Sequence, residues 1–144
     1  MPQHPRRVLF LCTGNSARSQ MAEALLREKG GENFKAFSAG LEPSPIHPLA
    51  VEAMAEIGID ITGQRAKGLV EYLGTQHFDY LVTVCDHAAA NCPTFPGVAH
   101  RLHWSLVDPA AAEGDHEQRL QVFRLVRDTL AELIDGFVAD HTPG

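Results

Sequence analysis

An eight-residue segment between an apolar run and an amphipathic stretch most constrains how this chain folds. The apolar run Arg7–Leu11 is typical of a buried strand, and it stops abruptly at Cys-Thr-Gly-Asn-Ser-Ala-Arg-Ser, residues 12–19. Behind this octet, apolar residues recur at helical spacing, which predicts a helix over Ser19–Lys29 that ends at two glycines. The sequence therefore predicts a strand, a tight loop and a helix in immediate succession.

The rest of the chain alternates between strand-like and helix-like patterns. Further strands are expected over Phe34–Ser38, Tyr80–Val84 and Arg101–Trp104. Further helices are expected from Pro48 to Gly58, around Val70–Leu73 and after Asp115, which resembles a capping box with Gln118. Such alternation predicts an α/β fold with parallel β-α-β units, and strands that are apolar throughout fit a parallel sheet covered on both faces.

The composition agrees with a single ordinary globular domain over residues 1–144. Hydrophobic residues make up 44% and charged residues 21%, which excludes a disordered, collagen-like or coiled-coil chain. The net charge is −6 and there is no basic run, so nucleic acids and anionic membranes are not expected as partners. We expect a monomer.

The N-terminus and the cysteine count indicate a cytoplasmic protein. The apolar run behind the first arginines is only Val8–Leu11, whereas a signal peptide needs about 7–15 apolar residues and a membrane span about 20. Cys12, Cys85 and Cys92 are an odd and sparse set, unlike a secreted disulfide framework. In a reducing compartment such thiols are reactive, metal-binding or simply buried.

Reactive residue types gather just beyond the predicted strands. In parallel sheets ligands bind at these carboxyl ends, because the connections there diverge to opposite faces. The positions hold Cys12-Thr-Gly-Asn, Ser38-Ala-Gly, Cys85-Asp-His and, after Trp104, Val107-Asp-Pro. We therefore expect the functional site at this edge of the sheet.

The octet is suited to binding a tetrahedral anion. Its successive backbone N–H groups can form an inward-facing nest beside a helix N-terminus. Gly14 is expected to allow the tight turn, Asn15 to accept a left-handed conformation, and Arg18 to grip two anion oxygens. The predicted anion-binding residues are Thr13, Gly14, Asn15, Ser16, Ala17 and Arg18.

The same octet favours a nucleophile. A cysteine near a helix N-terminus and a cation typically has its pKa lowered from about 8.5 to about 3.5–7.5. Cys12 is therefore the candidate nucleophile, and Ser19 is placed to donate a hydrogen bond to its sulfur. The alternative interpretation is a buried thiol beside a helix cap.

At this point the chain resembles the low-molecular-weight protein tyrosine phosphatase superfamily and, within it, the thioredoxin-coupled arsenate reductases. The resemblance runs almost end to end. Its motifs are Cys12-Thr-Gly-Asn-Ser-x-Arg-Ser-Gln-Met-Ala-Glu, Ser38-Ala-Gly, Ile59-Asp-Ile, Val82-Thr-Val-Cys, Asn91-Cys-Pro and His103-Trp leading to Asp108-Pro-Ala. The resemblance implies a four-stranded parallel sheet flanked by helices, with arsenate, phosphate or sulfate in the loop. It also implies Cys12 as nucleophile, Arg18 as oxyanion clamp and Asp108 as general acid.

A reductase must move two electrons, so we hypothesise a relay of three cysteines. Cys12 forms an adduct with arsenate, Cys85 attacks Cys12 and releases arsenite, and Cys92 attacks Cys85. By the resemblance, thioredoxin then reduces the Cys85–Cys92 disulfide. These two cysteines are seven residues apart, which in a helix is about 10.5 Å between Cα atoms, whereas a disulfide needs about 4.4–6.8 Å. Residues 86–91 must therefore be a loop or unwind.

Other interpretations of these residues stay open. Cys85 and Cys92 could be simply buried, or could bind zinc with His87, His100 or His103, although the spacing matches no familiar zinc pattern. An Asp-Pro pair alone is a common turn signal. A glutathione and glutaredoxin route could replace thioredoxin.

Two departures separate this chain from the phosphatases of the superfamily. Those usually carry an aromatic residue directly after the Asp-Pro pair and a proline after Arg-Ser, whereas this chain has Ala110 and Gln20. Both departures favour the reductase. The alternative function is a phosphatase that hydrolyses phosphate monoesters through a Cys12 phospho-enzyme, and residual phosphatase activity is compatible with a shared loop. From a different class, a non-catalytic oxyanion- or arsenite-binding module is the third hypothesis.

A potassium site of some reductases corresponds to Asn15, Glu23, Ser38 and Lys67 in this chain, with Lys67 in place of a carboxylate. In one interpretation the lysine ammonium takes the cation's place, which puts potassium dependence in doubt. In the other, Glu23 and Lys67 are ordinary solvated charges. We expect no bound metal and no cofactor, with thioredoxin as an external reductant.

Overall fold

Strand β1 (Arg6–Cys12) lies in the interior of the sheet, because it is an apolar run that is buried over most of its length. The computed structural model describes residues 4–72, 76–92 and 97–142. The other helices and strands of this part are α1 (Arg18–Gly30), β2 (Phe34–Gly40), α2 (Pro48–Ala55), β3 (Phe78–Thr83), α3 (Asp86–Asn91), β4 (Val98–His103) and α4 (His116–His141). Short 3₁₀ turns are η1 (Gly31–Asn33), η2 (Leu69–Glu71) and η3 (Pro109–Ala111).

The described strands form one parallel sheet in the order β2-β1-β3-β4. Cys12 at the end of β1 lies opposite Gly40 of β2, and Leu11 lies opposite Thr83 of β3. Thr83 in turn lies opposite His103 of β4. The carboxyl ends of the strands therefore meet at one edge, where the sequence places the reactive residues.

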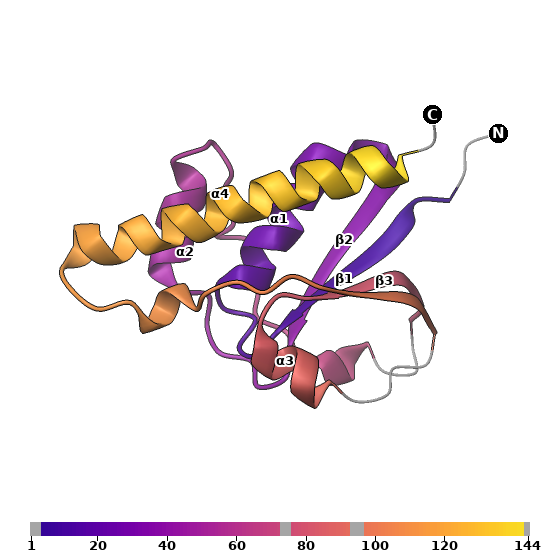
Figure 1. The fold of residues 1–144 in the computed structure, drawn as a ribbon, viewed down its shortest axis with the longest axis horizontal. Helices are drawn as coiled ribbons and strands as arrows, with labels where there is room; N and C mark the ends of the chain where they lie inside the picture. Colours follow the sequence, from indigo (N-terminus) through magenta and orange to yellow (C-terminus); the bar gives the residue numbers. More distant parts are fainter. Residues whose placement is uncertain (1–3, 73–75, 93–96, 143–144) are drawn as a thin grey trace.

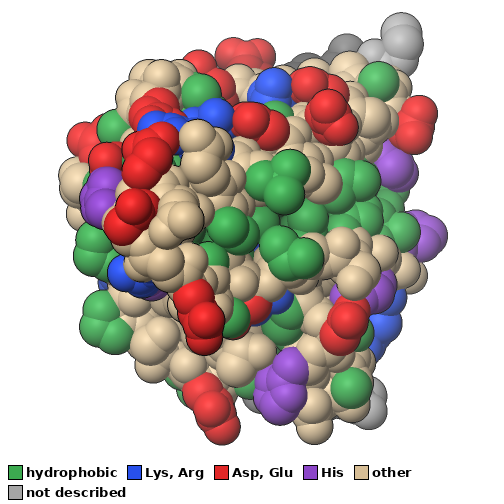
Figure 2. Space-filling model, turned by 60° about the vertical axis from the view of Figure 1, so that its left-hand side comes forward, with side chains coloured by type: hydrophobic (Ala, Val, Ile, Leu, Met, Phe, Trp, Pro, Cys, Tyr) green, Lys and Arg blue, Asp and Glu red, His purple; other side chains and the backbone are tan. Residues whose placement is uncertain are grey.

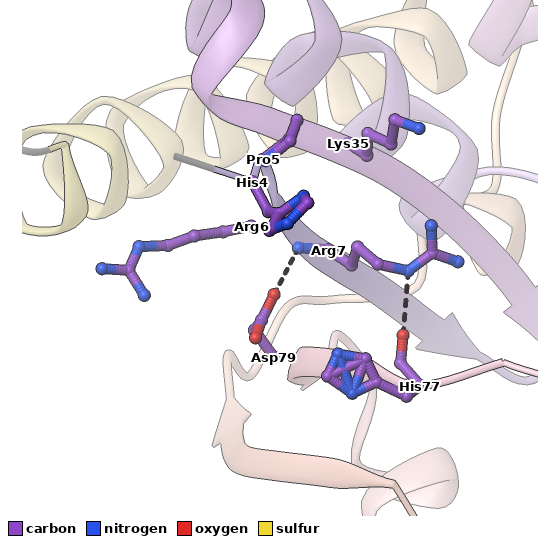
Figure 3. Close-up of a pocket in the computed structure, with 7 residues that line it drawn as sticks. All are labelled: His4, Pro5, Arg6, Arg7, Lys35, His77 and Asp79. Carbon is purple, nitrogen blue, oxygen red and sulfur yellow. Dashed lines mark hydrogen bonds between the residues drawn. The ribbon is translucent and has the colours of Figure 1, made fainter. Parts of the chain in front are cut away.

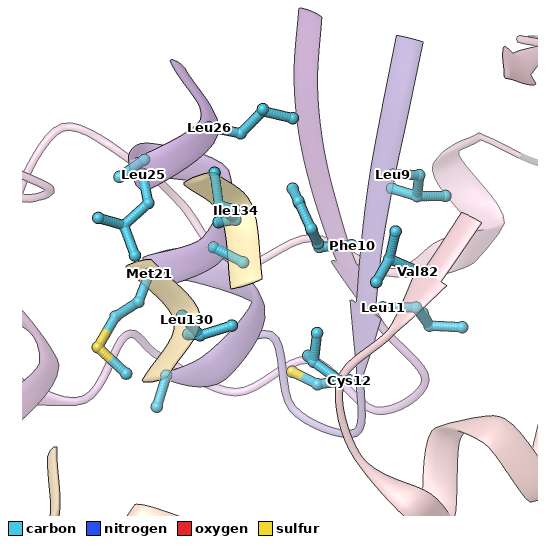
Figure 4. Packing of buried hydrophobic residues seen from close by; sticks show 14 of the residues in the cluster. Leu9, Phe10, Leu11, Cys12, Met21, Leu25, Leu26, Val82, Leu130 and Ile134 are labelled. Carbon is cyan, nitrogen blue, oxygen red and sulfur yellow. The ribbon is translucent and has the colours of Figure 1, made fainter. Parts of the chain in front are cut away.

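Helices cover both faces of this sheet (Figure 1). α1, α2 and α4 lie together on one side, and α3 lies on the other. Along β1, Phe10 and Cys12 point toward α1, whereas Leu9 and Leu11 point to the opposite face (Figure 4). The core between β1 and the helices includes Met21, Leu25, Leu26, Leu130 and Ile134.

The predicted α/β fold class is confirmed. The later strands begin earlier than expected, β3 at Phe78 and β4 at Val98. These two residues are paired with each other across the sheet. Strand pairing thus extends beyond the strongly apolar stretches that mark a strand in the sequence.

The predicted helices are present, except that α2 ends at Ala55 rather than near Gly58 and one short segment is a 3₁₀ turn. α4 begins with the expected capping box of Asp115 and Gln118. The helix expected around Val70–Leu73 is a 3₁₀ turn over Leu69–Glu71, and position 73 lies outside the described residues. A single turn suffices there because Leu69 is the buried residue of the segment while Val70 is exposed.

The surface carries charged side chains of both signs. On the face shown in Figure 2, acidic side chains are spread over much of the surface, with Lys and Arg side chains among them. This distribution accords with the net charge of −6. Among the helices that the structure describes, none is long and apolar enough to cross a bilayer.

Candidate active site

The segment between β1 and α1 wraps around the sulfur of Cys12. Residues 13–17 form a short loop that leads directly into the N-terminus of α1 at Arg18. The Cys12 Sγ accepts a hydrogen bond from the backbone N–H of Asn15 at 3.1 Å and lies 2.8 Å from the hydroxyl of Ser19. A buried sulfur that faces these two groups at a helix N-terminus is suited to act as a thiolate nucleophile.

A cavity of about 200 Å³ opens beside this loop. It is lined by Cys12, Thr13, Gly14, Ser16, Ala17, Arg18, Asp108 and Ala110. The cavity therefore brings together the predicted nucleophile, the predicted clamp and the predicted general acid. Most of its lining is the loop itself, which suits a small tetrahedral oxyanion.

The carbonyl groups of the loop are bonded on its outer side by residues 41–47. The bonds run from the N–H of Leu41 to the C=O of Cys12 at 3.1 Å, from Glu42 to Thr13 at 2.8 Å, from Ser44 to Gly14 at 2.9 Å and from His47 to Ser16 at 2.9 Å. Because a trans peptide places its N–H and C=O on opposite sides, these bonds turn the N–H groups of the loop away from residues 41–47. This outer segment therefore shapes the anion nest.

Glycines let the loop approach its neighbours closely. Asn15 adopts the positive φ of the loop, 51°, as expected. Gly14 does not have a positive φ, and a Cβ there would lie 2.9 Å from Ser44 Oγ, which is the end of a side chain that can rotate. A Cβ on Gly40 would lie 2.7 Å from the backbone nitrogen of Asn15. Close packing against the backbone of the loop therefore explains the glycine at position 40.

The side chain of Asn15 is fixed by three hydrogen bonds. Its Nδ2 donates to Ser19 Oγ at 2.7 Å. Its Oδ1 accepts from Gln20 Nε2 at 2.9 Å and from the backbone N–H of Lys67 at 2.8 Å. Asn15, Ser19 and Gln20 are fully buried. The loop is thereby tied to α1 and to the segment around Lys67.

Arg18 and Asp108 face each other at the cavity. Arg18 Nη2 lies 3.7 Å from Asp108 Oδ1, and its Nη1 donates to the carbonyl of Leu106 at 3.2 Å. Asp108 Oδ1 also accepts the backbone N–H of Ala110 at 3.0 Å and so caps η3. The Asp-Pro pair therefore makes a turn, and its Asp108 also lines the cavity. A half-exposed carboxyl group in this position is suited to pass a proton to a departing oxygen.

Cys85 lies beside the loop, at the start of α3. Its Sγ is 3.4 Å from Thr13 Oγ1, and Thr13 directly follows Cys12 in the chain. The same sulfur accepts the backbone N–H of Ala88 at 3.3 Å and acts as the N-cap of α3. Cys85 is buried. The parallel pairing of β1 and β3 thus brings a second thiol to the anion loop.

Cys92 lies at the opposite end of α3, as its C-cap. Residues 86–91 are helical, and the three cysteines are free thiols. Arg101 Nη1 lies 3.8 Å from Cys92 Sγ, and both residues line another cavity, of about 220 Å³. Of the two arrangements considered for residues 86–91, the structure has the helix, so a Cys85–Cys92 bridge requires α3 to unwind.

The residues of the expected cation site meet behind the loop. Lys67 Nζ lies 2.8 Å from the carbonyl of Arg65, 3.4 Å from Ser38 Oγ and 3.6 Å from Glu23 Oε1. Glu23 and Lys67 are only 5% and 9% exposed, so their interpretation as ordinary solvated charges is wrong. Burial lowers the pKa of Lys67 below its usual value, although the nearby Glu23 opposes this effect.

The histidines considered for zinc make other contacts. His103 Nε2 lies 2.9 Å from Asp86 Oδ1, and its Nδ1 lies 2.7 Å from Thr83 Oγ1. His100 stacks on Tyr80. Within residues 4–72, 76–92 and 97–142, no three His, Cys, Asp or Glu side chains are grouped so that they could hold a metal ion.

A larger cavity, of about 500 Å³, includes residues from the amino ends of β1, β2 and β3 (Figure 3). Its cationic side chains belong to Arg6, Arg7 and Lys35. The side chain of Arg6 points away from those of Arg7 and Lys35 (Figure 3). The three cations therefore do not converge on one anion, in contrast to the loop at Cys12.

A comparison with known protein families agrees with the geometry of this loop. Residues 7–141 match the family described as low molecular weight phosphotyrosine protein phosphatase. The chain belongs to this family.

Similar members of this phosphatase family include arsenate reductases. One from Halalkalibacterium halodurans is 46% identical over 130 residues, which cover 90% of this chain and 93% of that protein. A solved structure described as an arsenate reductase in the phosphate binding state has a TM-score of 0.80 and 32% identity, covering 94% of this chain and 98% of that chain. A thioredoxin-dependent arsenate reductase of Corynebacterium glutamicum has a TM-score of 0.69 and 28% identity, covering 98% of this chain and 66% of that chain.

Sequence reasoning missed the residues that support the phosphatase-family loop from outside. Residues 41–47 contribute only backbone N–H groups, which leave no mark on side-chain identity. Gly40 ends a predicted strand, and only the pairing of that strand with β1 places it against the loop. Gln20 stood out as a departure from the phosphatases, and its contacts with Asn15 supply the structural reason.

Proposed function

We propose that this chain reduces arsenate to arsenite through a Cys12-Cys85-Cys92 relay that thioredoxin regenerates. The position of Cys85 carries the proposal, because its sulfur lies 3.4 Å from Thr13 Oγ1, beside the anion loop. Hydrolysis of a phosphate ester needs no second thiol at this place, whereas a two-electron reduction does. The 46% identity to an arsenate reductase supports the same function.

In the first step, arsenate binds in the loop and the Cys12 thiolate attacks arsenic. The guanidinium of Arg18 and the N–H groups of the loop, apart from that of Asn15, which donates to Cys12 Sγ, hold the oxyanion. A bond forms between Cys12 sulfur and As(V), and one arsenate oxygen leaves as water with a proton from Asp108. Ser19, 2.8 Å from the sulfur, steadies the thiolate before the attack.

The next two steps transfer the electrons. The Cys85 thiolate attacks the Cys12 sulfur, so a Cys12–Cys85 disulfide forms and the S–As bond breaks. The electron pair of that bond stays on arsenic, which leaves as arsenite, As(III). The Cys92 thiolate then attacks Cys85, which forms the Cys85–Cys92 disulfide and releases the Cys12 thiolate. Two thiols thereby supply two electrons.

Thioredoxin closes the cycle by exchange of its dithiol with the Cys85–Cys92 disulfide. A solved neighbour described as a thioredoxin-dependent arsenate reductase supports this choice of reductant. We further propose that the protein works as a monomer in the cytoplasm, where reducing conditions keep its three cysteines as thiols. Sedimentation of the full chain in reducing buffer tests the monomer, and a dimer at micromolar concentration would contradict it.

We also propose that the ammonium of Lys67 takes the place of a monovalent cation, and that the enzyme needs no bound metal or cofactor. The residues present do not fit a potassium ion, because Lys67 Nζ already stands 2.8 Å from the carbonyl of Arg65 and 3.6 Å from Glu23. The test compares kcat/KM in potassium and choline salts at equal ionic strength. Equal values are expected, and severalfold activation by potassium alone would contradict the proposal.

The decisive test follows arsenate-dependent NADPH oxidation in the presence of thioredoxin and thioredoxin reductase. Wild type should turn over, and Cys85→Ser should lose this turnover. Hydrolysis of p-nitrophenyl phosphate by the same variant serves as the control, because the anion loop is intact in Cys85→Ser. Absence of arsenate turnover in wild type would overturn the proposal.

A phosphatase is the second candidate function, favoured by the family match over residues 7–141 and by the anion loop itself. It predicts ester hydrolysis that depends on Cys12 and is indifferent to Cys85. The same pair of assays separates the two functions. Ester hydrolysis without arsenate turnover would identify a phosphatase and leave Cys85 and Cys92 as packing residues.

A further inference from the structure

Gln20 is a buried amide whose nitrogen faces the anion loop. It is the third residue of α1, and its side chain is fully buried. Its Nε2 lies 3.0 Å from the carbonyl oxygen of Asn15, 2.9 Å from Asn15 Oδ1 and 2.8 Å from the carbonyl of Arg65. Its Oε1 accepts a hydrogen bond from Gln64 Nε2 at 2.6 Å.

These partners determine which way the amide of Gln20 points. Three acceptors surround its nitrogen, and a donor faces its oxygen, so only one orientation satisfies the group. A hydrocarbon at this position would remove one donor from each acceptor, and Asn15 Oδ1 and the Arg65 carbonyl would keep only their bonds from Lys67. A carboxylate would set negative charge against three oxygens. The site is therefore specific for glutamine rather than for any side chain of similar volume.

Asn15, the residue that Gln20 holds, supports the nucleophile in two ways. Its backbone N–H donates to Cys12 Sγ at 3.1 Å. Its Nδ2 donates to Ser19 Oγ at 2.7 Å, and this hydroxyl lies 2.8 Å from the same sulfur. Gln20 contacts both oxygens of Asn15: the bond to Oδ1 orients the amide that carries Nδ2, and the bond to the carbonyl holds the backbone of the residue whose N–H faces Cys12.

We propose that Gln20 is a positioning residue that sets the reactivity of Cys12 through Asn15. Gln64 contributes indirectly, because its Nε2 donates to Gln20 Oε1 and so orients the amide of Gln20. The inference rests on the proposed function only in taking Cys12 as the nucleophile. A merely structural role for Gln20 would change stability and leave the reactivity of Cys12 alone.

The test measures the rate of Cys12 alkylation by iodoacetamide between pH 5 and 9, with the modified residue assigned by mass spectrometry. Gln20→Met keeps the volume and loses the donors, and its rate at pH 6 should fall about tenfold, as expected for a lost hydrogen bond that acts on a charged group. The alkylation rate of Gln20→Met should approach the wild-type rate only at higher pH. In Gln20→Glu the alkylation rate at pH 6 should fall further. Met21→Leu, the next buried position of α1, is the matched control and should leave the profile unchanged.

A folded Gln20→Met variant with the wild-type alkylation profile would overturn the inference. If Gln20→Met does not fold, Gln64→Met carries the test, because it removes the donor to Gln20 Oε1 and to the Gln20 carbonyl while Gln20 itself stays in place. Its rate at pH 6 should fall about two- to threefold, and an unchanged rate would again overturn the inference. Alkylation needs no arsenate, so failure of the proposed reduction would show in the turnover assay of wild type and not in this profile.

Discussion

Gly40 and Asn15 are in such close contact that a Cβ on Gly40 would lie 2.7 Å from the backbone nitrogen of Asn15. The two other nearest atoms are also backbone atoms of the anion loop, in Thr13 and Gly14. Backbone atoms cannot rotate away as a flexible side chain can. The end of β2 therefore packs directly against the backbone of the loop and limits where the loop can lie.

Gly40→Ala should push the loop away from its position and lower kcat/KM for arsenate by about 100-fold, since a displacement of 1 Å at reacting groups has this order of effect. Steady-state kinetics of the variant check this. Gly63→Ala is the matched control, because a Cβ at Gly63 meets nothing within 4 Å. Near wild-type kinetics in Gly40→Ala would contradict the role assigned to this contact.

The loop could be predicted from the sequence because the residues that form it are consecutive. Cys12, Asn15 and Ser19 lie within one octet, and local rules for turns, caps and thiolates apply to it directly. The supporting residues are different. Gly40 and Gln64 reach the loop only through strand pairing and helix packing, and no local rule ranks these long-range partners from one sequence.

The state of residues 86–91 was the other open question. Three consecutive alanines favour a helix, but the distance that a disulfide requires favours a loop, and the sequence alone does not weigh these against each other. In the structure the cysteines are free and the segment is α3. Its only buried residue is Ala88, so little packing holds this helix.

Lys67→Met should destabilise the fold. The substitution would leave Glu23 buried, with Arg27 as its remaining ionic partner at 2.9 Å. Removing one member of a buried ion pair costs about 3 kcal/mol of unfolding free energy. Urea denaturation measures this loss. Lys29→Met, which breaks a more exposed pair with Asp135, should cost less than about 1 kcal/mol, and equal losses in the two variants would contradict the prediction.

The stability contributed by Glu56 should depend on pH. Hydrogen bonds from Arg124, with a further one from Arg127, lower the pKa of Glu56 from 4.5 to about 2. Because the pKa is lower in the folded state, the stabilisation is fully present above about pH 4.5 and is lost as the pH falls to about 2. The difference in urea midpoint between wild type and Glu56→Gln should be constant from pH 7 to 5 and shrink below. If the difference in urea midpoint at pH 3 is the same as at pH 7, the predicted pH dependence of the Glu56 contribution is wrong.

Asp86 should restrain the unwinding of α3. Its carboxylate lies 2.9 Å from His103 Nε2 and accepts a hydrogen bond from Ser105 Oγ at 3.1 Å. The bond to His103, followed by that to Ser105, lowers the pKa of Asp86, so the carboxylate stays ionised at neutral pH. Asp86→Asn should therefore raise the equilibrium constant for the Cys85–Cys92 disulfide about two- to fivefold, the range expected for a solvent-exposed polar contact.

Dithiothreitol redox buffers with mass spectrometry measure this equilibrium. Glu52→Gln is the control, because it breaks a similar exposed contact with His116 at 3.0 Å, on helices α2 and α4, which lie on the other face of the sheet from α3. The control should behave as wild type. If the equilibrium constant for the Cys85–Cys92 disulfide is the same in Asp86→Asn and wild type, the contact of Asp86 with His103 does not restrain the unwinding of α3.

The sulfur of Cys85 is both the cap of α3 and, in the proposed relay, the atom that attacks Cys12. A disulfide sulfur carries no negative charge, so it accepts the Ala88 N–H more weakly than a thiolate does and no longer favours the helix N-terminus by its charge. The cap of α3 therefore weakens at the stage when Cys92 must leave its place. The atom that forms the first disulfide is thus also the atom whose reaction weakens the helix that holds Cys92 away from it.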